Sequence, residues 1–230
     1  MFNVAIKYLY INLIGESMKV IAVMNEKGGA GKSTISIGLA CALYRQGERV
    51  VLVDSDPQGS ARDWRETAGE GAYLPPVIGL DKPDSIKDGL KAFSSMDWVI
   101  VDTPAKAAKT SGVIINAADF VLIPLQPSGL DVWGASAIVN LVGSYKDMGG
   151  QVEAGFVPTR IRPGTRLGSE ILDGEWNEYG IRQLNSVVCD RESYKKSITD
   201  GKSIFETSDS AAKGEIDCLL EEIQTILKGN

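Results

Sequence analysis

One stretch near the start of the chain constrains the fold more than any other: residues 25–34, which read Asn-Glu-Lys-Gly-Gly-Ala-Gly-Lys-Ser-Thr. An apolar run from Val20 to Met24 precedes it, and apolar residues spaced three or four apart follow it between Ile35 and Leu43. Strand, glycine-rich loop and helix, in this order, form the context that a phosphate-binding loop requires. Glycines let successive backbone N–H groups turn towards an anion, and the N-terminus of the helix adds its positive dipole end.

Two side chains of this stretch have the chemistry to complete a nucleotide site. Lys32 is placed to reach the β- and γ-phosphates, and the hydroxyl of Ser33 is placed to ligate Mg²⁺. The other candidate phosphate-binding residues of the stretch are Gly28, Gly29, Ala30, Gly31 and Thr34.

The loop departs from the general pattern G-x-x-x-x-G-K-[ST], because Glu26 stands where the pattern has glycine and Lys27 adds a second lysine. In this departure the loop resembles the deviant Walker A box of the ParA/MinD family of ATPases. The resemblance implies that Lys27 crosses a dimer interface to the nucleotide of the partner subunit. The alternative is an ordinary solvated loop lysine, but its place directly before two glycines favours the functional interpretation.

Two further strands are predicted to end in carboxylates. The apolar run from Val50 to Val53 leads into Asp54-Ser55-Asp56-Pro57-Gln58-Gly59, and the run from Trp98 to Val101 leads into Asp102. Open α/β sheets bind ligands at the carboxyl ends of their strands. The first string resembles the second nucleotide motif of ParA proteins, which assigns Asp54 to the water shell of Mg²⁺ and Asp56 to orienting the attacking water. Asp102 has the Walker B arrangement, in which the carboxylate binds Mg²⁺ through water.

The C-terminal half holds the candidate base-contacting and DNA-contacting residues. A strand predicted over 152–157 ends in Pro-Thr-Arg, and the family resemblance places adenine-contacting groups at Thr159 and Arg160. Basic residues are scattered further along the chain, as in most solvated surfaces. They are nevertheless the best candidates for a DNA-facing strip: Arg160, Arg162, Arg166, Arg191, Lys195, Lys196, Lys202 and Lys213.

Composition excludes several classes of site. The chain has no histidine, which removes Ser-His-Asp chemistry, histidine-ligated metals and histidine acid–base catalysis. Its 3 cysteines are far apart and form no C-x-x-C pair, so neither a disulfide framework nor a zinc site or cluster is indicated, and a reducing cytoplasmic location is the simplest inference. With a net charge of −6 the protein as a whole is not a basic DNA-binding surface.

Strands and helices alternate from Val20 to Leu227, which predicts one doubly wound, mostly parallel sheet with helices on both faces. We expect one P-loop ATPase domain over 18–230, and residues 1–17 as a non-native or disordered extension, since Met18 begins the strand that enters the loop. An added strand or a membrane-touching arm is the alternative for 1–17. The last predicted helix, 211–228, has an acidic outer face, which argues against a stable membrane association.

The segments 197–206 and 211–216 also resemble the C-terminal region of ParF-type plasmid partition proteins within the same family. The resemblance spans residues 18–227 and implies ATP and Mg²⁺ as ligands, a homodimer formed on ATP binding, and non-specific DNA binding on the nucleoid. It further implies hydrolysis stimulated by a small ParB-like or ParG-like partner, and partition of a plasmid, a chromosome or another cargo. The alternatives are a MinD-like membrane-associated regulator and a P-loop small-molecule kinase; an iron–sulfur reductase lacks its cluster cysteines here.

Overall fold

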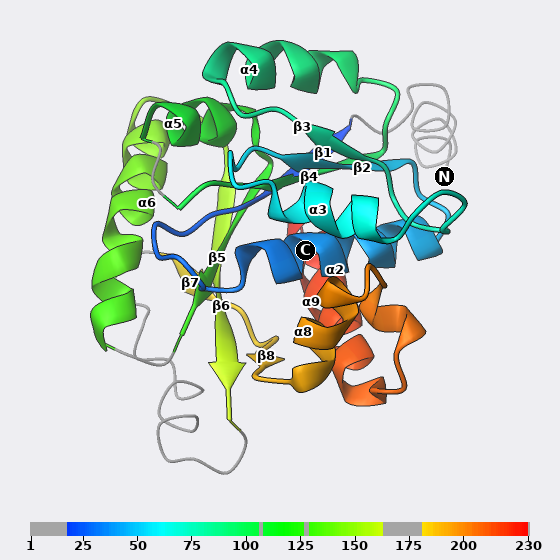
Figure 1. Cartoon of the computed structure of the whole chain (residues 1–230). Helices are drawn as coiled ribbons and strands as arrows, with labels where there is room; N and C mark the ends of the chain where they lie inside the picture. Colours follow the sequence, from blue (N-terminus) through cyan, green and yellow to red (C-terminus); the bar gives the residue numbers. More distant parts are fainter. Residues whose placement is uncertain (1–17, 106–107, 127–128, 163–180, 230) are drawn as a thin grey trace, which may run out of the picture.

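The computed structural model describes residues 18–105, 108–126, 129–162 and 181–229. Its centre is an eight-stranded sheet in the order β3-β2-β4-β1-β5-β6-β7, with β8 paired to β6. All of the described strand pairings are parallel. Figure 1 shows helices on both sides of this sheet, which confirms the predicted fold class.

The element bounds follow the sequence patterns closely. The strands are β1 (Lys19–Val23), β2 (Val50–Asp54), β3 (Val77–Gly79), β4 (Trp98–Asp102), β5 (Phe120–Leu125), β6 (Glu153–Ile161), β7 (Arg182–Gln183) and β8 (Val188–Cys189). The helices are α2 (Lys32–Arg45), α3 (Ser60–Thr67), α4 (Pro83–Ala92), α5 (Ala108–Ala117), α6 (Gly129–Asp147), α8 (Glu192–Thr199) and α9 (Ser210–Leu227), with a 3₁₀ turn η2 (Ile204–Glu206).

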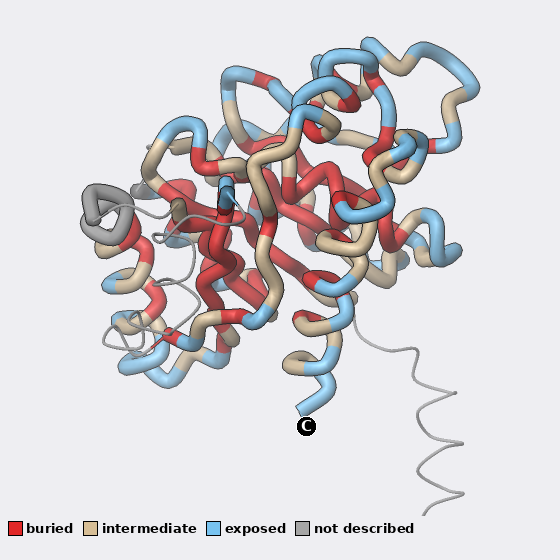
Figure 2. The backbone as a smooth tube through the Cα atoms, turned by 90° about the horizontal axis from the view of Figure 1, so that it is seen from below, coloured by how far each residue is buried: buried red, intermediate tan, exposed pale blue. Residues whose placement is uncertain are grey.

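The alternation of side chains along the strands divides the core into two layers. Ile21 and Val23 of β1 belong to a cluster that includes buried residues of α2 and α9. Val20 and Ala22 of the same strand belong to a second cluster, with buried residues of α4, α5 and α6. Central parallel strands are buried on both faces, which is why their sequences are continuously apolar. Figure 2 shows this buried centre enclosed by exposed outer turns.

Three features differ from the sequence prediction. Helix α5 and strand β7 were not expected, and β6 continues to Ile161 rather than ending at Val157. The segments 1–17 and 163–180 lie outside the described residues, so the expectation for residues 1–17 remains a prediction.

Helix α9 packs on the core, as its apolar stripe predicts. Ile216, Leu219, Leu220 and Ile223 are fully buried against the layer that contains α2. In the described part of the chain, no helix combines the length and the apolar character that crossing a membrane requires.

Candidate functional site

The loop between β1 and α2 has the conformation of an anion cradle. Gly29 and Gly31 have φ values of 75° and 96°, in the left-handed region that glycine adopts without strain. A Cβ at Gly31 would meet no atom within 4 Å, so its glycine is required by the backbone conformation and not by lack of space. The loop leads directly into α2, whose N-terminus favours negative charge.

Three polar side chains hold the loop from the ends of neighbouring elements. Asn25 donates from Nδ2 to the carbonyl of Pro124 at 2.6 Å, and its Oδ1 accepts from the backbone N–H of Lys27 at 2.8 Å. Gln126 donates to the carbonyl of Gly29 at 2.8 Å. Thr159 donates to the carbonyl of Ala30 at 3.2 Å. The strand ends of β5 and β6 therefore fix the loop before any ligand binds.

Lys32 lies inside the cradle with its ammonium group turned back onto the loop. Its side chain is largely buried, the residue being 8% exposed, and Nζ donates to the carbonyl of Lys27 at 3.2 Å. Burial lowers the pKa of Lys32, while the charges of Asp102 and Asp56 act in the opposite direction. A desolvated cation with so few acceptors gains strongly from a phosphate anion.

Asp102 has the environment expected of a carboxylate that holds a cation. It is fully buried at the end of β4, and Oδ1 accepts from the Ser36 hydroxyl at 3.4 Å. Among the described residues, Oδ2 has no hydrogen-bond partner. Burial raises the pKa of Asp102 to about 7, and the neighbouring Ser33 side chain lowers it. An orphaned oxygen beside a serine hydroxyl fits Mg²⁺, which is bound through one or two protein oxygens, waters and substrate phosphates.

Asp54 is paired in register with Asp102, but its carboxylate already accepts hydrogen bonds from three backbone N–H groups of its own chain. Oδ1 accepts from the backbone N–H of Asp56 at 3.1 Å, and Oδ2 accepts from those of Ala61 and Arg62 at 3.1 Å each. The carboxylate therefore closes the turn after β2 and satisfies backbone donors at the start of α3. Sequence reasoning assigned it only to the water shell of Mg²⁺ and missed this second task.

The half-buried carboxylate of Asp56 lies in the turn that Asp54 closes. Its Oδ1 accepts from the backbone N–H of Gln58 at 2.9 Å, and its carbonyl accepts from Arg62 at 3.0 Å. Asp56 also acts on the pKa of both Lys32 and Asp102, which places its charge near the cradle.

A small cavity of about 60 Å³ adjoins the loop on the side of β6. The residues around it come from four segments: Gly31, Thr34, Ile35, Thr159, Arg160, Val188, Cys189, Asp190, Arg191, Tyr194 and Lys195. Thr159 is buried, whereas Arg160 is exposed and has a left-handed backbone with φ of 53°. The two residues assigned to adenine contact therefore border the loop, together with Thr34.

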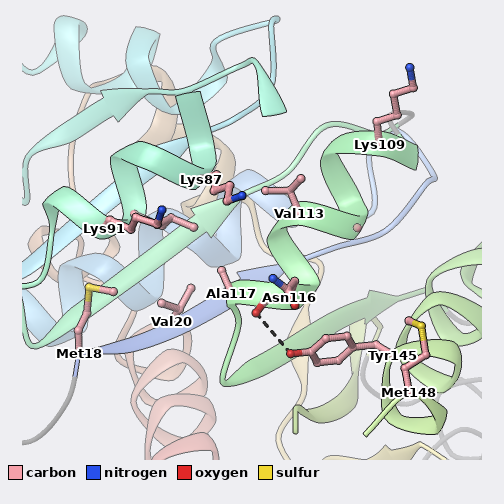
Figure 3. Close-up of a pocket in the computed structure, with 12 residues that line it drawn as sticks. Met18, Val20, Lys87, Lys91, Lys109, Val113, Asn116, Ala117, Tyr145 and Met148 are labelled. Atoms are coloured by element: carbon pink, nitrogen blue, oxygen red, sulfur yellow. Dashed lines mark hydrogen bonds between the residues drawn. The ribbon is translucent and has the colours of Figure 1, made fainter. Parts of the chain in front are cut away.

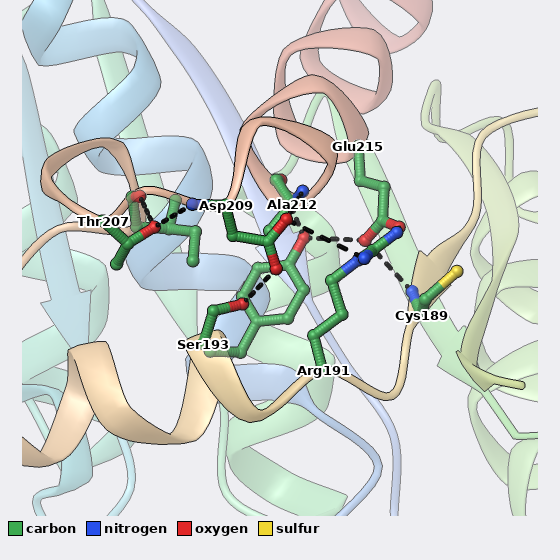
Figure 4. A network of polar contacts seen from close by, with 9 residues as sticks. Cys189, Arg191, Ser193, Thr207, Asp209, Ala212 and Glu215 are labelled. Atoms are coloured by element: carbon green, nitrogen blue, oxygen red, sulfur yellow. Dashed lines mark hydrogen bonds and ion pairs between the residues drawn. The ribbon is translucent and has the colours of Figure 1, made fainter.

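Glu215 on α9 binds three of the residues that line this cavity (Figure 4). Its carboxylate accepts from the backbone N–H of Cys189 at 3.1 Å, from Nε of Arg191 at 2.8 Å and from the hydroxyl of Tyr194 at 2.9 Å. Arg191 also forms an ion pair with Asp209 at 3.8 Å. Arg191 is thus half-buried and held by two carboxylates, which makes it a weaker candidate for the DNA-facing strip than the exposed lysines.

Most of the site residues expected from the sequence therefore meet at the carboxyl edge of the sheet. The cradle and Lys32, the first residue of α2, follow β1. Asp54 and Asp102 end β2 and β4, Asp56 lies in the turn after β2, and Thr159 lies near the end of β6. The Lys27 side chain is half-buried in the same loop. Sequence reasoning missed Asn25, Ser36, Gln126 and Glu215 as contributors.

Comparisons with known proteins agree with this geometry. Residues 21–204 match the family model described as the CobQ/CobB/MinD/ParA nucleotide binding domain. The chain is 31% identical over 208 residues to the maintenance of carboxysome distribution protein A of Halothiobacillus neapolitanus, covering 88% of this chain and 95% of that protein.

Two solved structures share the fold. The structure of apo McdA from Cyanothece superposes with a TM-score of 0.75 at 20% identity, covering 90% of this chain and 99% of that one. The septum site-determining protein MinD from Pyrococcus horikoshii, complexed with Mg-ADP, gives a TM-score of 0.69 at 16% identity, covering 91% and 97%.

Proposed function

Because the chain belongs to the CobQ/CobB/MinD/ParA family of nucleotide-binding domains, we propose that it is a Mg²⁺-dependent ATPase of the ParA type, which positions a cargo by cycling between nucleotide states. In this proposal the protein dimerises on ATP, binds DNA non-specifically as the dimer, and releases the DNA when a small ParB-like or ParG-like partner stimulates hydrolysis. In this role the protein would be located in the cytoplasm and associated with the nucleoid.

The observation that carries the proposal is a preformed cradle with a buried ammonium group on one side and a buried carboxylate oxygen without a hydrogen-bond partner, among the described residues, on the other. Lys32 is desolvated and faces the loop, while Oδ2 of Asp102 is buried without a hydrogen-bond partner in the described residues. A nucleoside triphosphate with Mg²⁺ would supply an anionic acceptor for Lys32 and a cation for Asp102.

We assign separate roles in phosphoryl transfer to the residues of the site. Backbone N–H groups of the loop and the ammonium of Lys32 would hold the phosphates, while Ser33, with Asp54 and Asp102 through waters, would hold Mg²⁺. Bound there, Mg²⁺ would neutralise charge on the phosphate oxygens. Asp56 orients the attacking water, and its half-buried position beside Lys32 suits that task. Thr159 and Arg160 border the space proposed for the adenine.

Lys27 is proposed to act across the dimer, where it neutralises charge on the γ-phosphate of the partner's nucleotide. Such a lysine resembles an arginine finger supplied in trans, and it makes hydrolysis depend on assembly. The rate of ATP hydrolysis then determines how long the dimer persists.

The experiment compares Lys27→Ala with Lys32→Ala and with Lys228→Ala, an exposed lysine beyond the end of α9. We expect Lys27→Ala to bind nucleotide almost normally, to dimerise weakly on ATP and to hydrolyse it slowly. Lys32→Ala should lose nucleotide binding itself, and Lys228→Ala should match the wild type. Turnover that is unchanged in Lys27→Ala would refute the role in trans.

The proposed DNA-contacting surface lies on α8 and the segments beside it. Lys195, Lys196 and Lys202 are exposed there. Lys195 and Arg162 both pair with Asp190, at 3.0 Å and 3.5 Å. Exposed ion pairs of this kind are weak and can be exchanged for phosphate contacts. Arg166 lies outside the described residues.

A MinD-like membrane regulator is the second candidate, and the structure disfavours α9 as its anchor. The apolar face of α9 is buried in the core. We propose a plasmid, a chromosome or a protein assembly as the cargo, the last because the name of one relative refers to carboxysome distribution.

A further inference from the structure

A large groove lies at the end of the sheet opposite to the phosphate loop. It has a volume of about 740 Å³ and is bounded by the start of β1, by α4 and α5, and by the segment at the end of α6 (Figure 3). Its lining is mainly apolar, and the residues that form this surface include Met18, Val20, Leu90, Val113, Ala117 and Met148. Nothing in the nucleotide chemistry uses this surface.

Lysines are the charged residues of the groove. Lys87 and Lys91 lie one helical turn apart on α4, and Lys109 lies in the first turn of α5. Among the described lining residues there is no aspartate or glutamate. Lys91 has an ion pair with Asp88 at 3.9 Å, but both side chains are well exposed, so the pair holds Lys91 weakly. A basic rim on a protein of net charge −6 indicates an acidic ligand.

Two features make the groove accessible to another helix. Gly112 lies within α5, and a Cβ added there would meet no atom within 4 Å, so that the wall is open at this point. Met148 is 79% exposed, and methionine adapts its shape to partner surfaces. An apolar floor between helices with charged edges is the usual form of a site that binds an amphipathic helix.

We propose that this groove docks an amphipathic α-helix of a partner protein, with its apolar stripe on the floor and with Asp or Glu side chains on the flank facing Lys87 and Lys91. A second copy of the chain fits less well, because a two-fold contact would bring the same lysines towards one another. The inference goes beyond the proposed ATPase cycle and does not depend on it.

The probe is a synthetic helical peptide with leucines at positions i, i+3, i+4 and i+7 and glutamates on both flanks, labelled for fluorescence anisotropy. A matched peptide carries lysine in place of each glutamate. The protein variants are Gly112→Leu, which fills the groove, and Lys87→Glu/Lys91→Glu, which reverses the charge of its rim. Gly214→Leu on α9 is the control, because its Cβ also projects into open space.

We expect the acidic peptide to bind the wild type, and Gly112→Leu and the charge-reversed variant to weaken binding by about tenfold or more. The lysine peptide should bind the charge-reversed variant better than it binds the wild type. Gly214→Leu should behave as the wild type, and ATP hydrolysis by Gly112→Leu should be unchanged, since the groove is remote from the loop.

Three results would overturn the proposal. Equal binding of the two peptides would contradict selection of acidic side chains by the lysines, and no binding of either peptide would contradict helix docking itself. Displacement of the peptide by vesicles rich in phosphatidylglycerol, with direct binding of those vesicles, would identify a lipid surface instead. Absence of peptide binding by the full chain, with binding only after removal of residues 1–17, would show that the chain's own N-terminus is the occupant of the groove. The thermal unfolding and circular dichroism of each variant verify that it is folded.

Discussion

Asp54 and Asp102 end neighbouring strands in the same register, yet the structure predicts opposite effects when each is changed to asparagine in the absence of nucleotide. Asp54 accepts three backbone N–H groups, two on one oxygen and one on the other. In Asp54→Asn one oxygen becomes an NH₂ group, so at least one backbone donor faces another donor. A lost hydrogen bond to a charged group costs about 1.5–3 kcal/mol, and the unsatisfied donor adds to this. We expect the free energy of unfolding to fall by about 3 kcal/mol.

Asp102 is instead a buried carboxylate with an orphaned oxygen. Its pKa in the folded protein, about 7, lies above its ordinary value of 3.8. The folded state therefore holds the proton more tightly than the unfolded state, and ionisation costs stability as the pH rises through 7. At about pH 8 this cost is up to about 4 kcal/mol, and Asp102→Asn removes it. The lost contacts with serine hydroxyls offset part of the gain.

The assay is urea unfolding of the wild type and both variants without nucleotide or Mg²⁺, at about pH 8 and about pH 5. We expect Asp54→Asn to be less stable than the wild type at both values. Asp102→Asn should be more stable at the higher pH, and the gain should shrink at the lower pH, where the wild type binds the proton. A stable Asp54→Asn beside a destabilised Asp102→Asn would refute the inference that Asp54 is needed by its backbone donors while Asp102 is a buried carboxylate with an oxygen that lacks a partner.

Further predictions concern the rest of the molecule. Gly201 has φ of 64°, and a Cβ there would lie 2.4 Å from the backbone nitrogen of Ala68, so Gly201→Ala should lower the free energy of unfolding by about 3 kcal/mol or more in urea titration. Asp209 caps α9, and Asp209→Ala should cost about 1 kcal/mol near neutral pH. The cap holds the pKa of that carboxyl below its usual range, so its stabilisation is lost as the pH falls through the folded pKa, and the two proteins should converge in acid. Exposed Cys218 should react with a thiol reagent in the folded protein, whereas Cys41, whose pKa burial raises to about 12, should react only on unfolding, as peptide mapping by mass spectrometry would show.

The predictable parts of the fold are those whose structure is determined by short, continuous stretches of sequence. The loop before α2 combines glycines, a lysine and a serine in consecutive positions, and its flanking strand and helix have clear periodicity. Helix α5 was missed because its sequence, AKTSGVIINA, contains a glycine and several β-branched residues, which are weak helix formers. Its packing between α4 and α6 overrides that preference.

The site residues that were missed act across long sequence separations. Asn25 contacts a carbonyl 99 residues away, and Gln126 reaches back 97 residues to the loop. Glu215 holds Arg191 from another helix. The capping role of Asp54 could be read only after the start of α3 was known. Sequence motifs therefore identify the residues that bind or react with a ligand. The residues that position them can be identified only from the folded structure.

We propose above all that ATP converts this protein into a DNA-binding dimer through Lys27. The most direct measurement is binding to long non-specific duplex DNA, at one moderate salt concentration, with ATP, with ADP and without nucleotide. The account predicts binding with ATP alone, and its loss in Lys27→Ala. Absence of DNA binding in every state, while the ATP-bound dimer still forms, would contradict it and would make a membrane or a protein scaffold the surface to test next.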